Sequence, residues 1–172
     1  MTESCDLTAR EMIQAFAART LSPVEVMQSV LERMAVAEPL LAATWAAKPD
    51  RALAEARRSE KRWASGVPAG PLDGVPVTIK ELIATEGDPK PVGSAAGDMT
   101  PQPQDAPPVQ RLREAGAIPF AKTTNPDYGM LSSGLSSFHA LSRNPWDTSR
   151  TPGGSSAGAG SAAAAGYGPL HL

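Results

Sequence analysis

The sequence predicts an α/β fold in which helices surround a mixed β-sheet. Residues 1–66 show the apolar spacing and capping patterns of helices, and an alanine-rich run after residue 156 favours one more helix. Short runs rich in β-branched and apolar residues predict strands at 75–80 and 117–122. Because helix and strand signals alternate along the chain, we expect the strands to form a mixed sheet covered by helices.

Length and charge narrow the class of protein. The 172 residues suffice for one domain with a sizeable core. The balance of 16 basic and 18 acidic residues gives no sign of a nucleic-acid or membrane partner. Residues 1–6 lack a targeting signal, and no apolar run approaches the ~20 residues that span a bilayer. We therefore expect a cytoplasmic protein, whose one cysteine, Cys5, lies in a frayed terminus and forms no internal disulfide or metal cluster.

Two capping boxes predict the first two helices. Thr8 is followed by Glu11, and Ser22 by Pro23 and Glu25, which are the residue types that satisfy free N–H groups at a helix start. Apolar residues then recur at helical spacing and predict the core faces: Met12, Ile13, Phe16 and Ala17 in the first helix, and Met27, Val30, Leu31 and Met34 in the second.

A third helix and the first strand follow. Asp50 is the expected N-cap of a helix that runs through Arg62, with a charged face in solvent and an alanine face against its neighbours. The glycines and prolines of residues 66–71 predict a turn that leads into the strand at 75–80. That strand ends in a lysine, Lys80.

Residues 86–108 predict a long surface connection because they are rich in proline, glycine and aspartate. A short helix capped near Asp105 is expected at 107–115. The next run, 117–122, predicts a strand that Pro119 weakens, because proline cannot donate a hydrogen bond to a neighbouring strand.

The stretch from Arg150 to Gly166 combines a glycine-rich loop with an alanine-rich helix signal. Ser155 and Ser156 stand at the junction, where free backbone N–H groups favour negative charge. A serine there can cap the helix, contact an anion or take part in hydrolysis. A flexible linker is disfavoured because Pro152 fixes the approach and the alanines favour a helix.

Two motif readings of this stretch lack the required context. Residues 154–158 match G-x-S-x-G, the nucleophile turn of α/β-hydrolases, but that turn follows an apolar strand, whereas residues 144–150 are polar. Residues 158–163 match a dinucleotide fingerprint that ends in alanine, but again without the strand or a later acidic residue.

A lysine that enters an apolar interior loses hydration, so its pKa falls and it can act as a base. Lys80 ends the apolar strand, so it is either such a buried lysine or a solvated lysine at the strand end. Ser155 is likewise either a catalytic group or only a helix cap. With residues 122–125 (Lys-Thr-Thr-Asn) and 143–146 (Arg-Asn-Pro-Trp), these segments resemble the amidase signature family of Ser-Ser-Lys hydrolases.

The resemblance extends from about Leu72 to Leu172 and is weaker in the N-terminal helices. It implies the first portion of a single amidase domain over 1–172, with a helical lead-in at 1–66 and an α/β catalytic part at 67–172 that is incomplete at the C-terminus.

By this resemblance Lys80 is the catalytic lysine, and Ser155 is the bridging serine that follows a cis peptide bond. Neutral Lys80 would accept a proton from Ser155, which accepts one from a nucleophilic serine. The Lys80 and Ser155 heavy atoms should then lie within about 2.6–3.2 Å of each other. Met130, Ser132 and Ser156 are the implied substrate-binding residues.

In the family the nucleophile lies on a second Gly-Gly-Ser loop that also supplies oxyanion-hole N–H groups. We expect that loop beyond Leu172, so the 172 residues alone should be inactive. The resemblance implies an amidohydrolase that cleaves a small-molecule carboxamide through an acyl-serine, without metal or cofactor, and is compatible with a homodimer. Two alternatives stay open: the amidase subunit of a tRNA-dependent amidotransferase, which needs a second protein as partner, and an inactive truncated remnant or binding module.

Three further positions qualify the resemblance. Glu81 stands next to the lysine, where the family more often has aspartate. Asp127 and Tyr128 stand where the family usually has an acidic residue followed by phenylalanine, which is a mild variant. The two histidines, His139 and His171, are too few for a histidine-rich metal site, and we expect each to be structural.

Overall fold

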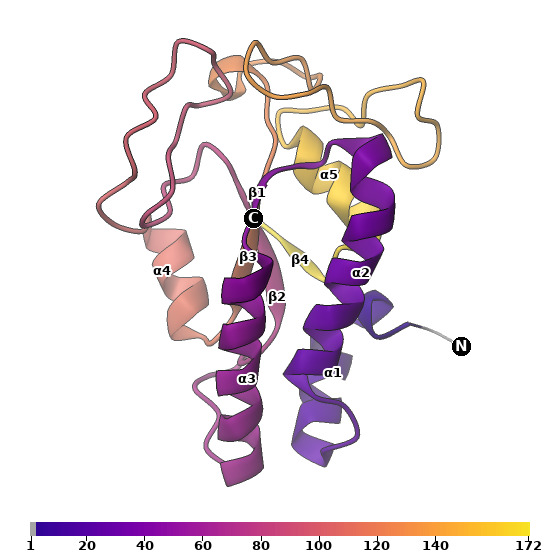
Figure 1. Cartoon of the computed structure of the whole chain (residues 1–172), viewed down its shortest axis with the longest axis vertical. Coiled ribbons are helices and arrows are strands. Elements are labelled where there is room, and N and C mark those ends of the chain that lie inside the picture. The colour runs from indigo at the N-terminus through magenta and orange to yellow at the C-terminus, as the bar shows by residue number, and fades with distance from the viewer. Residues whose placement is uncertain (1–2) are drawn as a thin grey trace.

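The computed structural model describes residues 3–172, which form a four-stranded mixed sheet with helices packed against it (Figure 1). Met1 and Thr2, the start of the segment searched for a targeting signal, lie outside the described residues. The strands are β1 (Thr44–Ala47), β2 (Pro76–Lys80), β3 (Ile118–Thr123) and β4 (Leu170–His171), in the order β1-β3-β2-β4. The pairs β2–β3 and β2–β4 are parallel and β1–β3 is antiparallel, which confirms the predicted fold class.

The helices account for most of the remaining regular structure. They are α1 (Ala9–Ala18), α2 (Pro23–Leu41), α3 (Pro49–Ser65), α4 (Pro107–Glu114) and α5 (Ala157–Ala164), with short 3₁₀ turns at Ser4–Asp6 and Asp127–Gly129. The loops that follow β2 and β3 gather at one end of the molecule, together with the start of α5 (Figure 1). In residues 3–172, no helix combines the length and the apolar character that crossing a membrane requires.

Both predicted capping boxes are present. Thr8 and Ser22 each accept a hydrogen bond from the backbone N–H three residues later, and the glutamate at that position bonds back to the cap. The expected cap of α3 is wrong, because Lys48 is the N-cap and forms no side-chain cap bond. Pro49 starts the helix earlier than expected since its fixed φ suits the first helical position. Asp50 lies in the first turn, where its charge still favours the helix.

The helix α4 starts next to Asp105 as expected, but the Asp105 side chain does not cap it. Ala106 is the N-cap and makes no side-chain cap bond. The Asp105 carboxylate is engaged elsewhere: it accepts from the backbone N–H of Glu86 at 2.8 Å and from Arg113 Nε at 2.7 Å. Sequence spacing cannot distinguish an aspartate that caps a helix from one that binds other partners, because both stand just before the helix. Residues 86–106 contain no helix or strand, as expected of a connection, but Asp88 in this stretch is buried.

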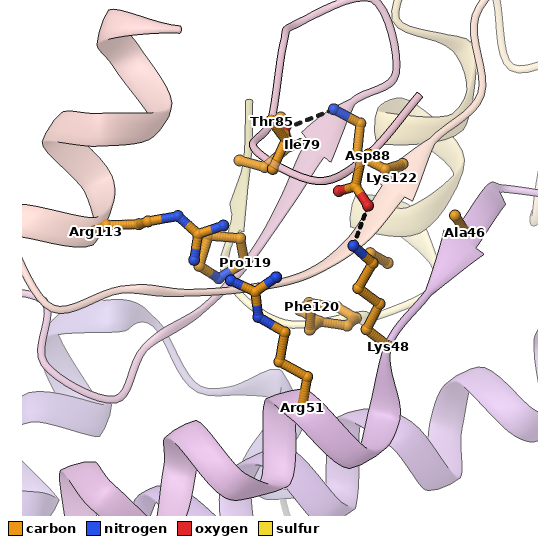
Figure 2. A pocket seen from close by; sticks show the side chains of 11 residues that line it. Ala46, Lys48, Arg51, Ile79, Thr85, Asp88, Arg113, Pro119, Phe120 and Lys122 are labelled. Atoms are coloured by element: carbon orange, nitrogen blue, oxygen red, sulfur yellow. Dashed lines mark hydrogen bonds and ion pairs between the residues drawn. The ribbon is translucent and has the colours of Figure 1, made fainter. Parts of the chain in front are cut away.

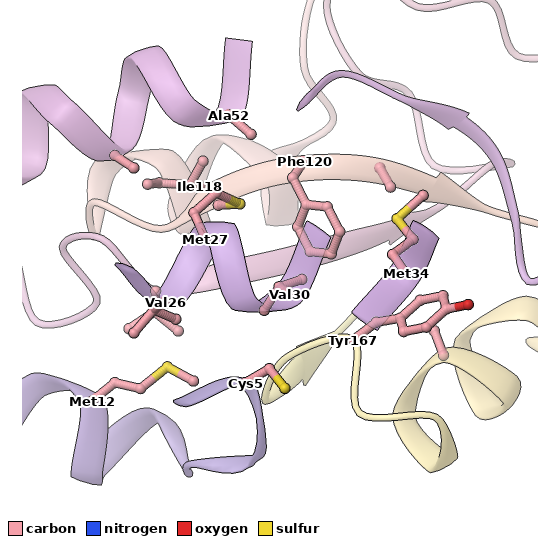
Figure 3. Packing of buried hydrophobic residues seen from close by; sticks show 14 of the residues in the cluster. Cys5, Met12, Val26, Met27, Val30, Met34, Ala52, Ile118, Phe120 and Tyr167 are labelled. Carbon is pink, nitrogen blue, oxygen red and sulfur yellow. The ribbon is translucent and has the colours of Figure 1, made fainter. Parts of the chain in front are cut away.

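The main core lies between α1, α2, α3 and the sheet (Figure 3). Its largest fully buried side chains include the predicted Met12, Phe16, Met27 and Val30, together with Phe120 of β3 and Tyr167 after α5. Cys5 also belongs to this core, with 1% of its surface exposed, so the expected frayed terminus is wrong. The short 3₁₀ turn is held down by a hydrogen bond from the Cys5 backbone N–H to Ser29 Oγ at 3.2 Å.

A second, smaller cluster joins α4 to β2. It packs Val109 of the helix against Val77 and Ile79 of the strand. The adjacent β3 tolerates Pro119 because the register with β2 shifts between Val77 and Thr78, as in a β-bulge, where the missing proline N–H costs little. The second cluster holds β2 through Val77 and Ile79, and the main core holds the residue just before the strand, Val75, so the strand that ends in Lys80 is anchored at its start and along its length.

Candidate active site

The structure brings Lys80 and Ser155 into direct contact. Lys80 is the last residue of β2, and its Nζ donates a hydrogen bond to Ser155 Oγ at 2.8 Å. The two residues are 75 positions apart in sequence, so this contact depends on the fold. The peptide bond between Gly154 and Ser155 is cis. The expected distance and the expected cis bond are therefore both confirmed, while the catalytic roles stay predictions.

Burial changes the acid–base properties of Lys80. Only 9% of the residue is exposed, and this loss of hydration lowers the pKa of its amine below the ordinary lysine value. A larger fraction of the amine is then uncharged near neutral pH. An uncharged amine in contact with a hydroxyl can accept the hydroxyl proton, which is what a general base does.

Close packing of α5 on the strand ends places Ser155. A Cβ atom at Gly158, in the first turn of α5, would lie 2.1 Å from the Ala43 carbonyl oxygen and 2.4 Å from the Thr124 backbone nitrogen. The Gly158 N–H instead donates to the Thr124 carbonyl at 3.0 Å. Glycine is thus required at this position because any side chain would push α5, and Ser155 before it, away from Lys80.

Ser156, and not Ser155, is the N-cap residue of α5, and it makes no side-chain cap bond. This excludes the interpretation of Ser155 as a helix cap, and the helix itself excludes the flexible linker. Ser156 is exposed beside the half-buried Ser155. Its hydroxyl is therefore accessible at the site without being committed to the helix.

The loop carrying Met130 and Ser132 borders the same serine. A Cβ at Gly154 would lie 2.7 Å from the Ser133 carbonyl oxygen and 2.9 Å from that of Leu131, so the loop backbone lies against the Gly154–Ser155 peptide. Met130 is 81% exposed and Ser132 is also exposed. The structure thus brings both residues to the edge of the site, and their contact with substrate stays a prediction.

The two histidines occupy different surroundings. His171 Nδ1 pairs with Thr78 Oγ1 at 2.8 Å and Nε2 pairs with the Gly168 carbonyl at 3.1 Å, while burial lowers the pKa of the ring. A neutral ring with both nitrogens occupied fits the expected structural role. His139 Nε2 lies 3.2 Å from the carboxylate of the fully buried Glu81, immediately after Lys80.

Sequence reasoning missed a second buried lysine, Lys122 of β3. It is 2% exposed, and its Nζ donates to the Ile83 carbonyl at 2.6 Å and to Thr85 Oγ1 at 2.7 Å. Burial lowers the pKa of its amine to about 8, against the opposing pull of nearby carboxylates, first that of Asp88. The available signal was the same as for Lys80: a lysine near the end of an apolar strand.

The surroundings of Lys122 form a narrow cavity lined by polar and apolar side chains (Figure 2). Asp88 forms an ion pair with Lys48 from the start of α3. The cavity among these side chains measures about 10 Å³, room for about one water molecule and no more. This cluster therefore holds the loop after β2 onto the sheet and offers no place for a substrate.

Metal-binding candidates are scarce in the described part of the chain. Glu3, Cys5 and Asp6 are the one group of His, Cys, Asp or Glu there whose ligand atoms lie close enough to share an ion. Both carboxylates already bind Arg33, Glu3 at 2.7 Å and Asp6 at 3.2 Å. The group therefore ties the N-terminal turn to α2 through Arg33.

Comparisons with known proteins show which family the sequence matches. The Amidase family model matches residues 25–172. A glutamyl-tRNA(Gln) amidotransferase subunit from Chloroflexus aurantiacus is 39% identical over 172 residues, which is 100% of this chain and 35% of that protein. The chain therefore spans about a third of the length of such relatives.

Solved structures share the overall fold of this chain. A fatty acid amide hydrolase superposes with a TM-score of 0.92 at 25% identity, covering 98% of this chain and 30% of that chain. The peptide amidase from Stenotrophomonas maltophilia superposes with a TM-score of 0.81 at 31% identity, covering 90% of this chain and 33% of that one.

Proposed function

The chain belongs to the amidase signature family, and from this premise we propose that the whole protein is an amidohydrolase that cleaves a carboxamide through an acyl-serine intermediate. One observation carries the proposal: the desolvated amine of Lys80 lies 2.8 Å from the hydroxyl of Ser155. A lysine that can be neutral, in contact with a serine at the edge of an accessible loop, is the proton-accepting half of a hydrolytic triad.

In the proposed mechanism the uncharged Lys80 amine accepts the proton of Ser155, and Ser155 accepts the proton of the nucleophilic serine. That serine adds to the amide carbonyl carbon, and the same relay returns the proton to the leaving nitrogen as the C–N bond breaks. Water then attacks the acyl-serine ester, the relay passes a proton from that water to the serine oxygen as the ester C–O bond breaks, and the carboxylate leaves. By the family resemblance, the nucleophile and its oxyanion-hole N–H groups lie beyond Leu172 in the whole protein.

We further infer that residues 1–172 are the first portion of a single amidase domain, with the helical lead-in at 1–66 and the catalytic part from 67. Two observations support this division: one sheet and one core join both parts, and the chain covers about a third of the length of its relatives. Met130, Ser132 and Ser156 are the proposed substrate contacts, since all three are exposed next to Ser155. The 172 residues alone are expected to be inactive.

The test is amide hydrolysis by the purified whole protein, assayed with short aliphatic, aryl and peptide amides. We expect ammonia or amine release that a chelator leaves unchanged and that Ser155→Ala lowers about 10²-fold or more. A trapped acyl-enzyme detected by mass spectrometry would place the ester on a serine. Hydrolysis that persists fully in Ser155→Ala would contradict the proposal.

A second candidate follows from the curated relatives, because the proteins about 39% identical to this chain are amidotransferase subunits. In that case the same relay would release ammonia from a donor amide only within a complex. Strict dependence of the activity on a partner protein and on an aminoacyl-tRNA would favour this candidate over the free amidohydrolase. No activity under either condition would favour a remnant or a binding module.

A further inference from the structure

Glu81, the residue after Lys80, presents an unusual contact set. It is fully buried, and a buried carboxylate is costly unless donors surround it. Three donors do so: the backbone N–H of Val92 at 3.0 Å, that of Gly93 at 2.6 Å, and His139 Nε2 at 3.2 Å. One side chain thus joins the end of β2 to the loop that follows the strand and to the loop that carries His139, 58 residues further along the chain.

The imidazole of His139 has one polar partner in the described part of the chain. A carboxylate only accepts hydrogen bonds, so Nε2 carries the hydrogen that points at Glu81. The other nitrogen, Nδ1, is buried and has no partner within residues 3–172. The ring packs against Trp45 and Phe138, with centroids 5.7 and 5.0 Å away. An apolar side chain would fill this aromatic pocket without leaving a buried nitrogen unpaired, so the bond to Glu81 is what the imidazole adds.

The two loops that Glu81 joins are also bound to each other. Ser136 Oγ accepts the backbone N–H groups of Phe138 at 3.0 Å and His139 at 2.8 Å and donates to the Gly93 carbonyl. Ser137 Oγ accepts the backbone N–H of Ala95 at 3.0 Å. The segment from Ser136 to His139 is therefore a fixed support for the Glu81 carboxylate.

The same loop reaches the other half of the relay. Upstream of His139, the carbonyl groups of Leu131 and Ser133 lie against the Gly154–Ser155 peptide. On the opposite side, the Glu81 backbone N–H donates to the Thr123 carbonyl at 2.9 Å and fixes the strand end next to Lys80. One loop therefore contacts the supports of both Lys80 and Ser155.

From these contacts we propose that Glu81 and His139 are positioning residues that hold Lys80 at hydrogen-bonding distance from Ser155. The expected effect on kcat rests on the proposed function, whereas the expected effect on the pKa of Lys80 does not. The carboxylate acts on the strand end, and the imidazole acts on the carboxylate and on the loop under Ser155. A misplacement of about 1 Å in a catalytic group can lower the rate about 10²-fold, so the support is expected to be visible in turnover.

The test uses four variants of the whole protein. Glu81→Gln keeps the shape but removes the charge, His139→Leu removes the donor, and His139→Gln returns an N–H donor near the position of Nε2. The control, Asp73→Asn, alters another fully buried carboxylate, bonded to Arg62 and Ala69 ahead of β2, at the end remote from Lys80.

Two readouts are combined. The first is kcat and KM for amide hydrolysis: Glu81→Gln and His139→Leu should lower kcat about 10- to 100-fold with KM nearly unchanged, and His139→Gln should recover most of the loss. The second is the pH dependence of Lys80 acetylation by acetic anhydride, read by mass spectrometry. Loosening the strand end admits water, so in the first two variants the Lys80 midpoint should rise toward that of an ordinary lysine.

The Lys80 titration needs no substrate, so it still decides the matter if the wild-type protein proves to have no amidase activity. If His139→Leu fails to fold, the same two measurements on the isosteric variant Glu81→Gln still test the proposal. The proposal is wrong if Glu81→Gln leaves both kcat and the Lys80 midpoint at their wild-type values. It is equally wrong if Asp73→Asn shifts them as much, because the effect would then be general destabilisation.

Discussion

Lys80 and Lys122 lie on the neighbouring strands β2 and β3, where Lys122 pairs with Ile79 and Lys80 with the next residue, Thr123, and both lysines are buried. Both amines have a lowered pKa because burial removes their hydration, and the more buried Lys122 reaches about 8. Their side chains leave opposite faces of the sheet. Lys80 meets Ser155, whereas Lys122 meets the Ile83 carbonyl and Thr85.

The difference shows that a depressed pKa does not by itself make a catalytic base. A backbone carbonyl has no proton to give, and Thr85 is 3% exposed inside a cluster that leaves room for about one water. Ser155 stands between the exposed residues Gly154 and Ser156, so a group that binds at the surface can pass a proton to its hydroxyl. The useful lysine is the one whose partner has a route to the outside.

The largest expected effect separates the two lysines directly. In the whole protein Lys80→Met should lower kcat/KM for amide hydrolysis by about 10²–10⁴-fold, the usual contribution of a positioned base. Lys122→Met should retain most of the activity per folded molecule, because its amine does not contact Ser155. Near-normal turnover by Lys80→Met, measured at neutral pH, would show that another group is the base.

The partner hydroxyls provide the next contrast. Ser155→Ala should cost about 10²-fold or more in kcat, since the relay loses the group that accepts the nucleophile's proton. Thr85→Val removes the hydroxyl that Lys122 contacts and should leave kcat unchanged. Steady-state kinetics of both variants, normalised to folded protein by circular dichroism, measure this difference. Equal losses in the two variants would mean that the contacts are structural on both sides of the sheet.

A smaller effect is expected from the helix that carries Ser155 toward Lys80. Gly158→Ala places a methyl group where the Ala43 carbonyl lies 2.1 Å away, and such overpacking typically costs about 1–3 kcal/mol of unfolding free energy. Gly160→Ala in the same helix has open space, with its nearest neighbour at 4.0 Å, and should be neutral or stabilising. Denaturant unfolding of both variants checks the pair; equal stability would contradict the close approach of α5.

The smallest effect is the dependence of stability on pH near Lys122. Above about pH 8 the folded protein has released this proton, whereas an unfolded lysine keeps it up to about pH 10.4. Because the unfolded state binds more protons in that interval, the free energy of unfolding should gain a positive slope with pH. Lys122→Met should lack this contribution, and chemical denaturation between pH 8 and 10 measures it. Identical slopes would mean that Lys122 titrates normally.

The sequence predicted local features well. The capping boxes of α1 and α2 depend on residues three positions apart, so spacing alone defines them. Lys80 and Ser155 were predicted only through motifs, and their meeting at 2.8 Å depends on packing between remote segments. Cys5 was misplaced because its burial comes from α2, which sequence periodicity near the terminus does not report.

Other features had no local signal. β1 (Thr44–Ala47) is a short edge strand whose residues are mostly half-buried, so neither a long apolar run nor a clear alternation marks it. The buried pair of Glu81 and His139 is separated by 58 residues and becomes visible only when the loops are folded. The competing uses of Asp105 are equally non-local, since its partners Glu86 and Arg113 lie on either side of it in sequence.

The most direct test of the central claim is the pH dependence of kcat/KM for amide hydrolysis by the whole protein, compared in the wild type and in Lys122→Met. If Lys80 is the base, the rate rises with pH along a limb whose midpoint lies below the ordinary lysine value, because burial lowers the pKa of its amine. That midpoint should be the same in both proteins. A limb that moves or disappears in Lys122→Met would contradict the account and transfer the role of base to the other lysine.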